Sequence, residues 1–484
     1  MGIVTHINLL KKRRTKIVAT IGPASASAEI IEQLVSAGVN VFRLNMSHGN
    51  HEFHLNSYRL IREQAARVGL PVAILADLCG PKIRAGKFKG GEIQLVSGTT
   101  VTVTTRDVEG EPGLIPSQYA ALAGDVRPGN RILLNDGLLE LTVLSVNNTE
   151  ITCQVVHGGT LKNHKGINLP GVNVSAPSLT DKDRIDAHFA LELGVDFLAL
   201  SFVRTANDID QLRTLITGTG KYCAIVAKIE KPEALEDIDR IIDATDAVMV
   251  ARGDLGVELN PEEVPVAQSQ LIDKSRAKFK PVIVATQMLE SMVESARPTR
   301  AEVADIAHSV TLGADAVMLS AETASGRFPV EAVQMMDRIA RQTESHLWKN
   351  GAYGASDMRR VMPPLPIWDV MANATAHISH DIMAHAVIII SSSGMSATTM
   401  SSARPAAPII AITDRPHVYR KMALLWGVIP VYIEDAGKTD PVELARKVAG
   451  NSGIAAPGDY VLLVRGFSSN PAQNSPSITC LMVQ

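Results

Sequence analysis

The stretch AIVAKIEKPEALEDIDRIIDATDAVMVARGD, residues 224–254, has the pattern of a strand, a helix and a second strand. Both strands, 224–230 and 247–254, are continuous apolar runs of the kind found in parallel sheets buried on both faces. The segment between them, 231–245, begins with a proline near the helix start and continues with helical apolar spacing. Such a unit predicts an α/β fold with a parallel sheet.

Two charged residues interrupt the first of these strands. Lys228 and Glu230 are two residues apart, and side chains two apart on a strand point to the same face. They are either a structural ion pair or part of a reactive site. We favour the reactive site, because a buried ion pair is costly to desolvate and adds little stability.

The same unit repeats along the chain. The predicted strands are KIVATI (16–21), VNVFRL (39–44), VAILAD (72–77), VDFLALS (195–201), AIVAKIE (224–230), AVMVARGD (247–254), PVIVAT (281–286) and ADAVMLS (314–320). The predicted helices include 27–38, 179–194, 231–245 and 299–313, with Thr180 or Asp181 opening the second and Gly194 closing it. Eight such strands predict a closed (β/α)8 TIM barrel, and the alternative is an open doubly wound sheet.

Two further domains are predicted from changes of pattern. Residues 82–177 show alternating strands with Asn-Asp-Gly and Asn-Asn turns, which predicts an inserted all-β lid domain with a β-barrel form. The barrel would then comprise residues 1–81 and 178–344. The pattern changes again from about residue 345: MPPLPIWD (362–369) is interpreted as a linker or irregular stretch, and residues 345–484 are predicted to be a C-terminal three-layer α/β domain.

Composition limits the class of protein. The 484 residues carry a net charge of −3, which gives no electrostatic case for general nucleic-acid or membrane binding. No apolar run approaches the length of a membrane span. The four cysteines are far apart in sequence, so we expect free thiols in a reducing cytoplasm. The basic segment KKRR (11–14) is interpreted as a solvated approach to the first strand.

Polar side chains gather where the predicted strands end, which is where such barrels build active sites. They are Thr20; Arg43, Asn45, Ser47 and His48; Asp77, Lys82 and Arg84; Ser201; Lys228 and Glu230; Arg252 and Asp254; Thr286; and Ser320 and Glu322. The pairs Arg43/Asn45, Lys228/Glu230, Arg252/Asp254 and Ser320/Glu322 are each predicted to face one way along a strand.

This set of residue types predicts phosphoryl transfer. Glu230 and Asp254 suit a hard divalent ion such as Mg²⁺, and Arg43 and Lys228 suit a phosphate group. Gly253 allows backbone N–H groups to approach a substrate carboxylate. The structural alternative for Arg252 is an ion pair across the barrel mouth, and Met288 is expected to pack in the core. There is no GxxxxGK[ST] motif.

Several segments resemble the signature segments of the pyruvate kinase family. They include TKIVATIGPAS, RLNMSHG, GPKIRAG, KGINLPG, VAKIEKPEAL, MVARGDLGVE, ATQMLESM, RPTRAEVADIA and MLSAETASGRFPVEAV, within residues 15–333. The resemblance implies transfer of phosphate from phosphoenolpyruvate to ADP, giving pyruvate and ATP, with Mg²⁺ or Mn²⁺ as cofactor. It also implies a cytoplasmic homotetramer whose lid closes over the nucleotide.

The resemblance implies a role for individual residues. Lys228 and Arg43 match residues on the transferring phosphoryl group, and Glu230 and Asp254 match the metal ligands. Thr286 matches the threonine that protonates the enolate through water, and Ser320 belongs to that relay. Backbone at Ala251, Gly253 and Asp254 would meet the substrate carboxylate, beside Thr286. The residues that match positions near the nucleotide phosphates are Asn45, His48, Arg84 and Lys165.

Two departures from the family concern the cations it uses. Members that need K⁺ hold it with residues matching Asn45, Ser47, Asp77 and the backbone carbonyl at Leu78, where threonine is usual. They carry glutamate in GPEIR, whereas this chain reads GPKIR with Lys82. A lysine there can place its ammonium near the cation site, so we expect catalysis without K⁺.

The C-terminal domain carries SSSGMSATT (391–399), similar to the family's effector phosphate loop. Ser391, Ser392, Ser393, Gly394 and Ser396 would form the cradle. Met395 replaces a basic residue frequent in members activated by fructose 1,6-bisphosphate, and the chain end departs from the usual pattern. We therefore expect a sugar monophosphate or a nucleotide as activator.

Two other functions remain open from the residues. A Mg²⁺-dependent enolate lyase or aldolase on a similar barrel would explain Lys228, Glu230 and Asp254 but not KGINLPG or Arg84. A metabolite-sensing scaffold with a dead site is disfavoured by the intact constellation.

Overall fold

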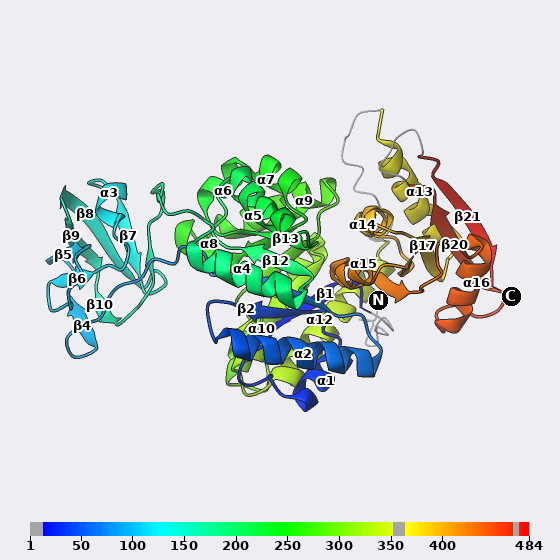
Figure 1. The fold of residues 1–484 in the computed structure, drawn as a ribbon, viewed down its shortest axis with the longest axis horizontal. Coiled ribbons are helices and arrows are strands. Elements are labelled where there is room, and N and C mark those ends of the chain that lie inside the picture. The colour runs from blue at the N-terminus through cyan, green and yellow to red at the C-terminus, as the bar shows by residue number, and fades with distance from the viewer. Residues whose placement is uncertain (1–12, 352–363, 468–473, 484) are drawn as a thin grey trace, which may run out of the picture.

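The computed structural model describes residues 13–351, 364–467 and 474–483, which form three bodies in a row (Figure 1). A central barrel lies between an inserted strand-rich domain at one end and an α/β domain at the other. None of the helices within these ranges is long and apolar enough to cross a membrane.

The central sheet is a closed barrel of parallel strands, in the order β1-β16-β15-β14-β13-β12-β3-β2. The strands are β1 (Lys16–Thr20), β2 (Val41–Asn45), β3 (Ala73–Asp77), β12 (Phe197–Leu200), β13 (Ala224–Ile229), β14 (Ala247–Ala251), β15 (Val282–Ala285) and β16 (Ala316–Leu319). The eight predicted strands and the closed barrel are confirmed, and the open doubly wound sheet is excluded.

Helices cover the outside of the barrel. They are α1 (Ala28–Ser36), α2 (His51–Val68), α4 (Asp181–Leu193), α5 (Ala206–Gly218), α6 (Pro232–Glu236), α7 (Ile238–Ala244), α9 (Val264–Ala277), α10 (Arg300–Leu312) and α12 (Pro329–Lys349). Thr180 caps α4 by accepting from the Asp183 N–H, and Gly194 ends it at φ 80°. The helix predicted over 231–245 is two helices, because the chain breaks at Asp237 between α6 and α7.

Two predicted strands end earlier than expected. β14 stops at Ala251 and α8 (Arg252–Glu258) begins at once, while β16 stops at Leu319 and α11 (Ala321–Ala324) follows Ser320. Arg252/Asp254 and Ser320/Glu322 are therefore not same-face strand pairs, and that prediction was wrong. The physical reason is that the chain turns into a helical conformation at the polar residues themselves, so the period of two no longer applies.

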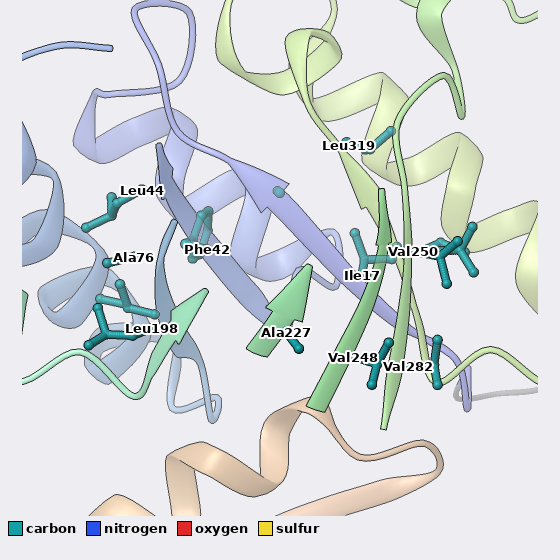
Figure 2. Close-up of a cluster of buried hydrophobic side chains, with 14 of the residues drawn as sticks. Ile17, Phe42, Leu44, Ala76, Leu198, Ala227, Val248, Val250, Val282 and Leu319 are labelled. Atoms are coloured by element: carbon teal, nitrogen blue, oxygen red, sulfur yellow. The ribbon is translucent and has the colours of Figure 1, made fainter. Parts of the chain in front are cut away.

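The barrel has two apolar layers because successive strand residues face opposite ways. Ile17, Phe42, Leu198 and Val250 point outward and pack against the helices, and all four are fully buried (Figure 2). The inward-facing positions form a separate cluster inside the barrel, which contains Val18, Val41, Leu75, Phe197 and Met249.

The inserted domain consists of two sheets and not of the one closed barrel that was predicted. Their strand pairs are antiparallel except for β5 with β6. One sheet has the order β11-β7-β8-β9-β5-β6 and the other pairs β10 with β4. The elements are β4 (Glu92–Leu95), β5 (Thr100–Thr104), β6 (Leu114–Pro116), α3 (Leu122–Asp125), β7 (Arg131–Leu134), β8 (Leu139–Asn147), β9 (Glu150–His157), β10 (Gly159–Lys162) and β11 (Ile167–Asn168). Asn135, Asp136 and Asn148 have positive φ in the β7–β8 and β8–β9 turns, as the sequence predicted.

The C-terminal domain is the predicted three-layer structure. Its sheet has the order β19-β18-β17-β20-β21, with only β21 antiparallel, and a separate apolar cluster covers each face. The elements are α13 (Ile367–Asp381), β17 (Ala386–Ile390), α14 (Met395–Ser402), β18 (Ile409–Thr413), α15 (Pro416–Lys421), the 3-10 helix η2 (Met422–Leu424), β19 (Val428–Tyr432), α16 (Pro441–Asn451), β20 (Tyr460–Arg465) and β21 (Ser477–Met482).

Two predictions about the start of this domain need correction. The predicted boundary after residue 344 lies inside α12, which continues to Lys349. The predicted irregular stretch 362–369 overlaps the first turn of α13, which begins at Ile367, while residues 362–363 lie outside the described part.

The C-terminal domain closes the floor of the barrel, the end where the strands begin. Ala423 and Leu424 of η2 belong to the apolar cluster inside the barrel. Around them, Arg404 forms an ion pair with Asp315 at 3.0 Å, and Arg420 forms one with Asp196 at 2.8 Å.

The basic N-terminal segment is less solvated than predicted. Arg13 is buried and pairs with Asp337 of α12 at 3.1 Å. Lys16, also buried, donates from Nζ to the Val428 carbonyl of the C-terminal domain at 2.6 Å. Residues 11 and 12 of the KKRR segment lie outside the described ranges.

Candidate active site

Asp77, at the carboxyl end of β3, holds one cation from the adjacent strand β2 and one from β13, two strands away on the other side. Its Oδ2 accepts from Arg43 Nε at 2.6 Å, and its Oδ1 lies 3.3 Å from Lys228 Nζ. Burial by itself would raise the pKa of Asp77, but Lys228 and Arg43 outweigh it and hold that pKa below its usual value. The carboxylate is therefore charged at neutral pH.

Lys228 sits at the centre of this charged cluster. Its Nζ lies 2.8 Å from Glu230 Oε1 and donates to Ser201 Oγ at 2.6 Å. Burial acts to lower the pKa of Lys228, but the carboxylates of Asp77 and Glu230 more than compensate, and the net pKa is raised. A permanent ammonium is thus fixed at the barrel mouth.

Glu230 is a buried carboxylate with a second acid nearby. Its Oε2 accepts from the Phe202 N–H at 2.7 Å. Burial raises the pKa of Glu230, Asp254 adds to this effect, and Lys228 opposes it. Two hard oxygen donors that repel each other in a desolvated place fit a divalent cation such as Mg²⁺. Among the described residues, no group of three or more His, Cys, Asp or Glu side chains is placed to hold a metal ion.

Thr286 adopts a backbone conformation rare for a β-branched residue, with φ 71°. Its Oγ1 accepts from the Gly253 N–H at 2.8 Å and donates to the Ala285 carbonyl at 2.6 Å. Arg252 donates from Nη2 to the Thr286 carbonyl at 2.7 Å and pairs with Asp305 of α10 at 2.7 Å. Arg252 thus has the structural ion pair that was considered, but its acid lies on the outer helix α10 and not across the barrel mouth.

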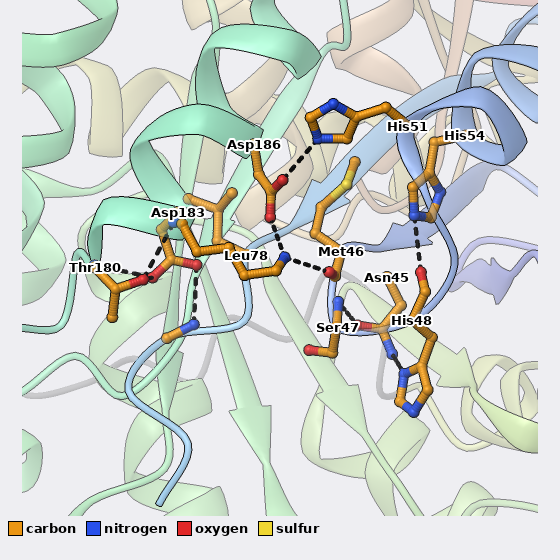
Figure 3. A network of polar contacts seen from close by, with 12 residues as sticks. Asn45, Met46, Ser47, His48, His51, His54, Leu78, Thr180, Asp183 and Asp186 are labelled. Atoms are coloured by element: carbon orange, nitrogen blue, oxygen red, sulfur yellow. Dashed lines mark hydrogen bonds and ion pairs between the residues drawn. The ribbon is translucent and has the colours of Figure 1, made fainter. Parts of the chain in front are cut away.

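The loop after β2 is held in place by contacts from α4 (Figure 3). Lys182 donates from Nζ to the Met46 carbonyl at 2.9 Å and pairs with Asp186 at 2.5 Å. Within the loop, Asn45 Nδ2 lies 3.2 Å from His48 Nδ1, and Asn45 Oδ1 accepts from the Ser47 N–H at 3.2 Å. These contacts fix the positions of three predicted site residues, Asn45, Ser47 and His48.

Basic groups from the barrel and the lid converge on His48. Burial lowers the pKa of His48, and the charges of Lys82, Arg84 and Arg43 lower it further. The imidazole is therefore neutral at physiological pH and stands in a positively charged environment. Such an environment attracts the phosphates of a nucleotide.

The cleft between the lid and the barrel is crossed by a short chain of contacts, which we call the lid latch: Asn168, Glu258 and Lys231. Lys231 Nζ lies 2.5 Å from Glu258 Oε1, and the same oxygen accepts from Asn168 Nδ2 of β11 at 3.3 Å. Asn168 and Lys231 line the cleft, which also contains Lys82 and Asp254.

Known proteins match the chain over nearly its whole length. The family models "Pyruvate kinase, barrel domain" and "Pyruvate kinase, alpha/beta domain" match residues 12–333 and 369–478. The chain belongs to the pyruvate kinase family. Pyruvate kinase 2 of Synechocystis is 46% identical over 98% of this chain and 80% of its own length, and a pyruvate kinase of Agrobacterium vitis is 43% identical over 94% of each. The crystal structure of a Cryptosporidium parvum pyruvate kinase superposes with a TM-score of 0.92 at 36% identity, covering 99% of this chain and 98% of the other.

These matches confirm the predicted pyruvate kinase fold and activity and give no support to the lyase or aldolase alternative. The structure brings most of the residues that resemble the family's site to one end of the barrel. Arg43, Asp77, Lys228 and Glu230 are in direct contact.

Other predicted pyruvate kinase residues lie around this centre. Arg84 pairs its backbone with Gly166, the residue after Lys165, and donates from Nη1 to the His164 carbonyl at 3.1 Å, so Arg84 and Lys165 stand on adjacent lid segments. The Leu78 carbonyl accepts from Ser201 Oγ at 2.7 Å. Ser320 follows β16, whose neighbour β15 leads to Thr286.

All three residues of the lid latch were missed by sequence reasoning, and Asn168 was passed over in the segment KGINLPG. Lys231 was assigned only to a helix start, and Glu258 was passed over in the segment MVARGDLGVE. The signal available was their position: Lys231 follows Glu230 directly, and Glu258 lies one helical turn beyond Asp254 on α8.

The predicted effector loop lies in the C-terminal domain, away from this site. It joins β17 to α14, and Gly394 takes φ 83° where the loop enters the helix. Its N–H donates to Ser391 Oγ at 3.0 Å, while Ser392 and Ser393 are exposed. Met395 and Ser396 form the first turn of α14.

Proposed function

We propose that this pyruvate kinase carries out transfer from phosphoenolpyruvate to ADP with Lys228 and Arg43 as its phosphoryl-binding cations. The observation that supports this most strongly is the buried cluster of Arg43, Asp77, Lys228 and Glu230. It fixes two cations, already charged and desolvated, at the mouth of the barrel, where they would stabilise charge on a transferring phosphoryl group.

The other groups of the site would each contribute to a different part of the reaction. Glu230 and Asp254 would hold Mg²⁺ or Mn²⁺, which neutralises charge on the phosphoryl and carboxylate oxygens when bound. The backbone at Ala251 and Gly253 faces Thr286 and would meet the substrate carboxylate. Transfer of the phosphoryl group leaves an enolate of pyruvate, and a proton reaching its carbon through Thr286, Ser320 and water would give pyruvate.

ADP would bind between the barrel and the lid. Asn45, His48, Arg84 and Lys165 supply donors and positive charge from both sides of the cleft, and closure of the lid would exclude water from the reacting phosphate.

One assay tests the reaction and the central residue together. Pyruvate formation from phosphoenolpyruvate is followed with and without ADP, for the wild-type chain and for Lys228→Ala. The proposal predicts ADP-dependent turnover that Lys228→Ala removes. Turnover without ADP, or full activity of the folded variant, would contradict it.

We propose further that catalysis does not need K⁺. Two observations support this: the charge of Lys82 lowers the pKa of His48, and the His48 ring lies 3.2 Å from Asn45 Nδ2. In a K⁺-free assay, added K⁺ should change the rate little, and Lys82→Glu should make the enzyme K⁺-dependent. Strong stimulation of the wild type by K⁺ would rule the proposal out.

An activator carrying one phosphate, a sugar monophosphate or a nucleotide, is proposed at the loop of Ser391, Ser392, Ser393, Gly394 and Ser396. Two exposed serines beside the start of α14 support it. Ser393→Ala and Ser396→Ala should weaken activation several-fold, and unchanged activation would count against this loop.

The protein is proposed to be a homotetramer. It is also proposed to be cytoplasmic, which agrees with its expected substrates, phosphoenolpyruvate and ADP. Light scattering on the eluted full-length chain should give a mass near four times 51.8 kDa. A monomeric mass would reject it.

A further inference from the structure

A second cavity, of about 250 Å³, lies between the barrel floor and the C-terminal domain. On the barrel side it is bounded by the amino-terminal end of β12 and by residues 278–281 ahead of β15. On the other side it is bounded by α14 and residues 421–425. The cavity is therefore at the opposite end of the barrel from Lys228, and it is distinct from the active site.

The charged groups of this cavity are mainly positive. Lys278, Lys280 and Lys421 line it, and Asp246 is the one acid among its lining residues within the described part of the chain. That acid is already engaged: Asp246 pairs with Arg213 at 3.1 Å and lies 3.8 Å from Lys421 Nζ. The cavity thus retains an excess of positive charge.

The lysines come from two different domains; Lys278 is paired with Asp243 at 2.8 Å, whereas Lys280 and Lys421 donate to neutral partners. Lys280 donates from Nζ to the Thr245 carbonyl at 2.5 Å, and Lys421 donates to the Tyr222 hydroxyl at 2.7 Å. Burial lowers the pKa of Lys280, and the charges of Lys421 and Arg213 lower it further although Asp246 opposes them. An anion bound between the two domains would reduce the electrostatic repulsion between these cations.

The cavity also offers an apolar wall. Phe279 lies at its edge and takes φ 56° where it ends α9, with the Lys280 N–H donating to the Ser275 carbonyl. Leu424 and Leu425 extend this wall toward the barrel interior.

We propose that this cavity binds a phosphate monoester of a small metabolite, with the phosphate between Lys280 and Lys421 and the organic part against Phe279 and Leu425. Because Lys280 belongs to the barrel and Lys421 to the C-terminal domain, the ligand would join the two domains. The site is separate from the exposed serines of the effector loop, so it does not depend on that proposal.

Calorimetric titration of the full-length chain tests the site. The probes are inorganic phosphate, ribose 5-phosphate and adenosine 5′-monophosphate, which distinguish a phosphate, a sugar and a base contribution. We expect a monoester to bind, and its Kd to rise about tenfold or more in Lys280→Gln and in Lys421→Gln, because each loses a charged hydrogen bond to phosphate. Lys438→Gln, which removes an exposed lysine paired with Asp435, and Ser393→Ala should leave that Kd unchanged.

Two further variants keep the test decisive if the Lys280 and Lys421 variants, at half-buried positions, do not fold. Lys278→Gln removes an exposed lysine of the same wall, and Thr398→Phe fills the cavity from α14 without changing charge. Both should weaken binding. The proposal is overturned if none of the monoesters binds at millimolar concentration, if binding is the same in all cavity variants, or if Ser393→Ala alone removes it.

Discussion

Lys228 has two roles that one substitution can separate. It would carry the transferring phosphoryl group, and it also balances the buried carboxylates of Asp77 and Glu230. Lys228→Ala should lower kcat by a factor on the order of 10²–10³ or more, as for the loss of a preorganised charge donor. Breaking buried pairs should also cost about 3–5 kcal/mol of stability in metal-free protein.

Added Mg²⁺ should distinguish the loss of activity from the loss of stability in Lys228→Ala. Since Mg²⁺ at Glu230 would offset part of the unpaired negative charge, adding it should restore melting temperature more in the variant than in the wild type, without restoring activity. Differential scanning calorimetry and the coupled assay measure the two. Lys274→Ala, at an exposed pair with Asp239, is the control. A variant that is active once folded would show that the lysine is only structural.

Lys16 predicts a pH dependence of the domain interface. Burial, with Arg13 and Arg14 nearby, lowers the pKa of Lys16 to about 7, and Glu344 opposes this only in part. The unfolded chain binds the proton up to about pH 10, so it holds more protons than the folded chain between pH 7 and pH 10. Stability from this group therefore rises with pH across that window.

The matched variant for this effect is Lys16→Met, which keeps the length and removes the titration. The melting temperature of the wild type should rise relative to that of Lys16→Met between pH 7 and pH 9.5. A difference that stays constant or falls would mean that Lys16 remains charged in the folded protein.

At the level of elements, the lid latch should govern closure over the nucleotide. Asn168 of β11 is the lid's contribution, and its bond to Glu258 joins the lid to α8 beside Asp254. Asn168→Ala should raise KM for ADP several-fold and leave KM for phosphoenolpyruvate nearly unchanged, because it removes one hydrogen bond worth about 1 kcal/mol from the closed state. Steady-state kinetics measure both constants.

The control for the latch is Asn147→Ala, at an exposed position of β8 in the same domain. If both variants raise KM for ADP equally, the effect comes from the lid in general. If KM for phosphoenolpyruvate rises as much as KM for ADP, the latch acts on the barrel site and not on closure.

The elements were largely predictable because continuous apolar runs fix buried parallel strands. The apolar pattern of the sequence did not predict the residue at which each strand ends and the next turn begins. Arg252 and Ser320 were assigned to strands, yet helices start there, since a strand end has no apolar period to mark it. The positive φ of Thr286 also left no trace in the sequence, because threonine ordinarily avoids that conformation.

The residues of the site were predicted mainly from motifs, and the contacts between them came only with the fold. Glu230 was expected to be a metal ligand, and the structure also places its carboxylate 2.8 Å from Lys228 Nζ. Long-range contacts such as Arg13 with Asp337 were not predictable, because a run of basic residues gives no sign of a distant partner.

At the scale of the whole molecule, η2 acts as the floor of the barrel. Leu424 is fully buried among inward-facing strand residues. Leu424→Ala should cost about 2–5 kcal/mol, as for other large-to-small changes in a core, and should loosen the C-terminal domain from the barrel. Calorimetry should show a lower melting temperature, with the domains unfolding in separate transitions.

The control for the floor is Tyr432→Ala, an exposed position of β19 in the same domain. A melting temperature for Leu424→Ala equal to that of the control would show that the floor contributes no stability.

The floor also has a consequence for the order in which the chain is made. The last barrel strand, β16, ends at Leu319, and η2 follows about 100 residues later. At ribosomal rates of about 5–20 residues per second, the strands exist for roughly 5 to 20 seconds before the segment that covers them has been synthesised. During that interval the apolar floor of the nascent barrel is exposed to the cell. This is therefore the period of synthesis in which the chain most needs protection from aggregation.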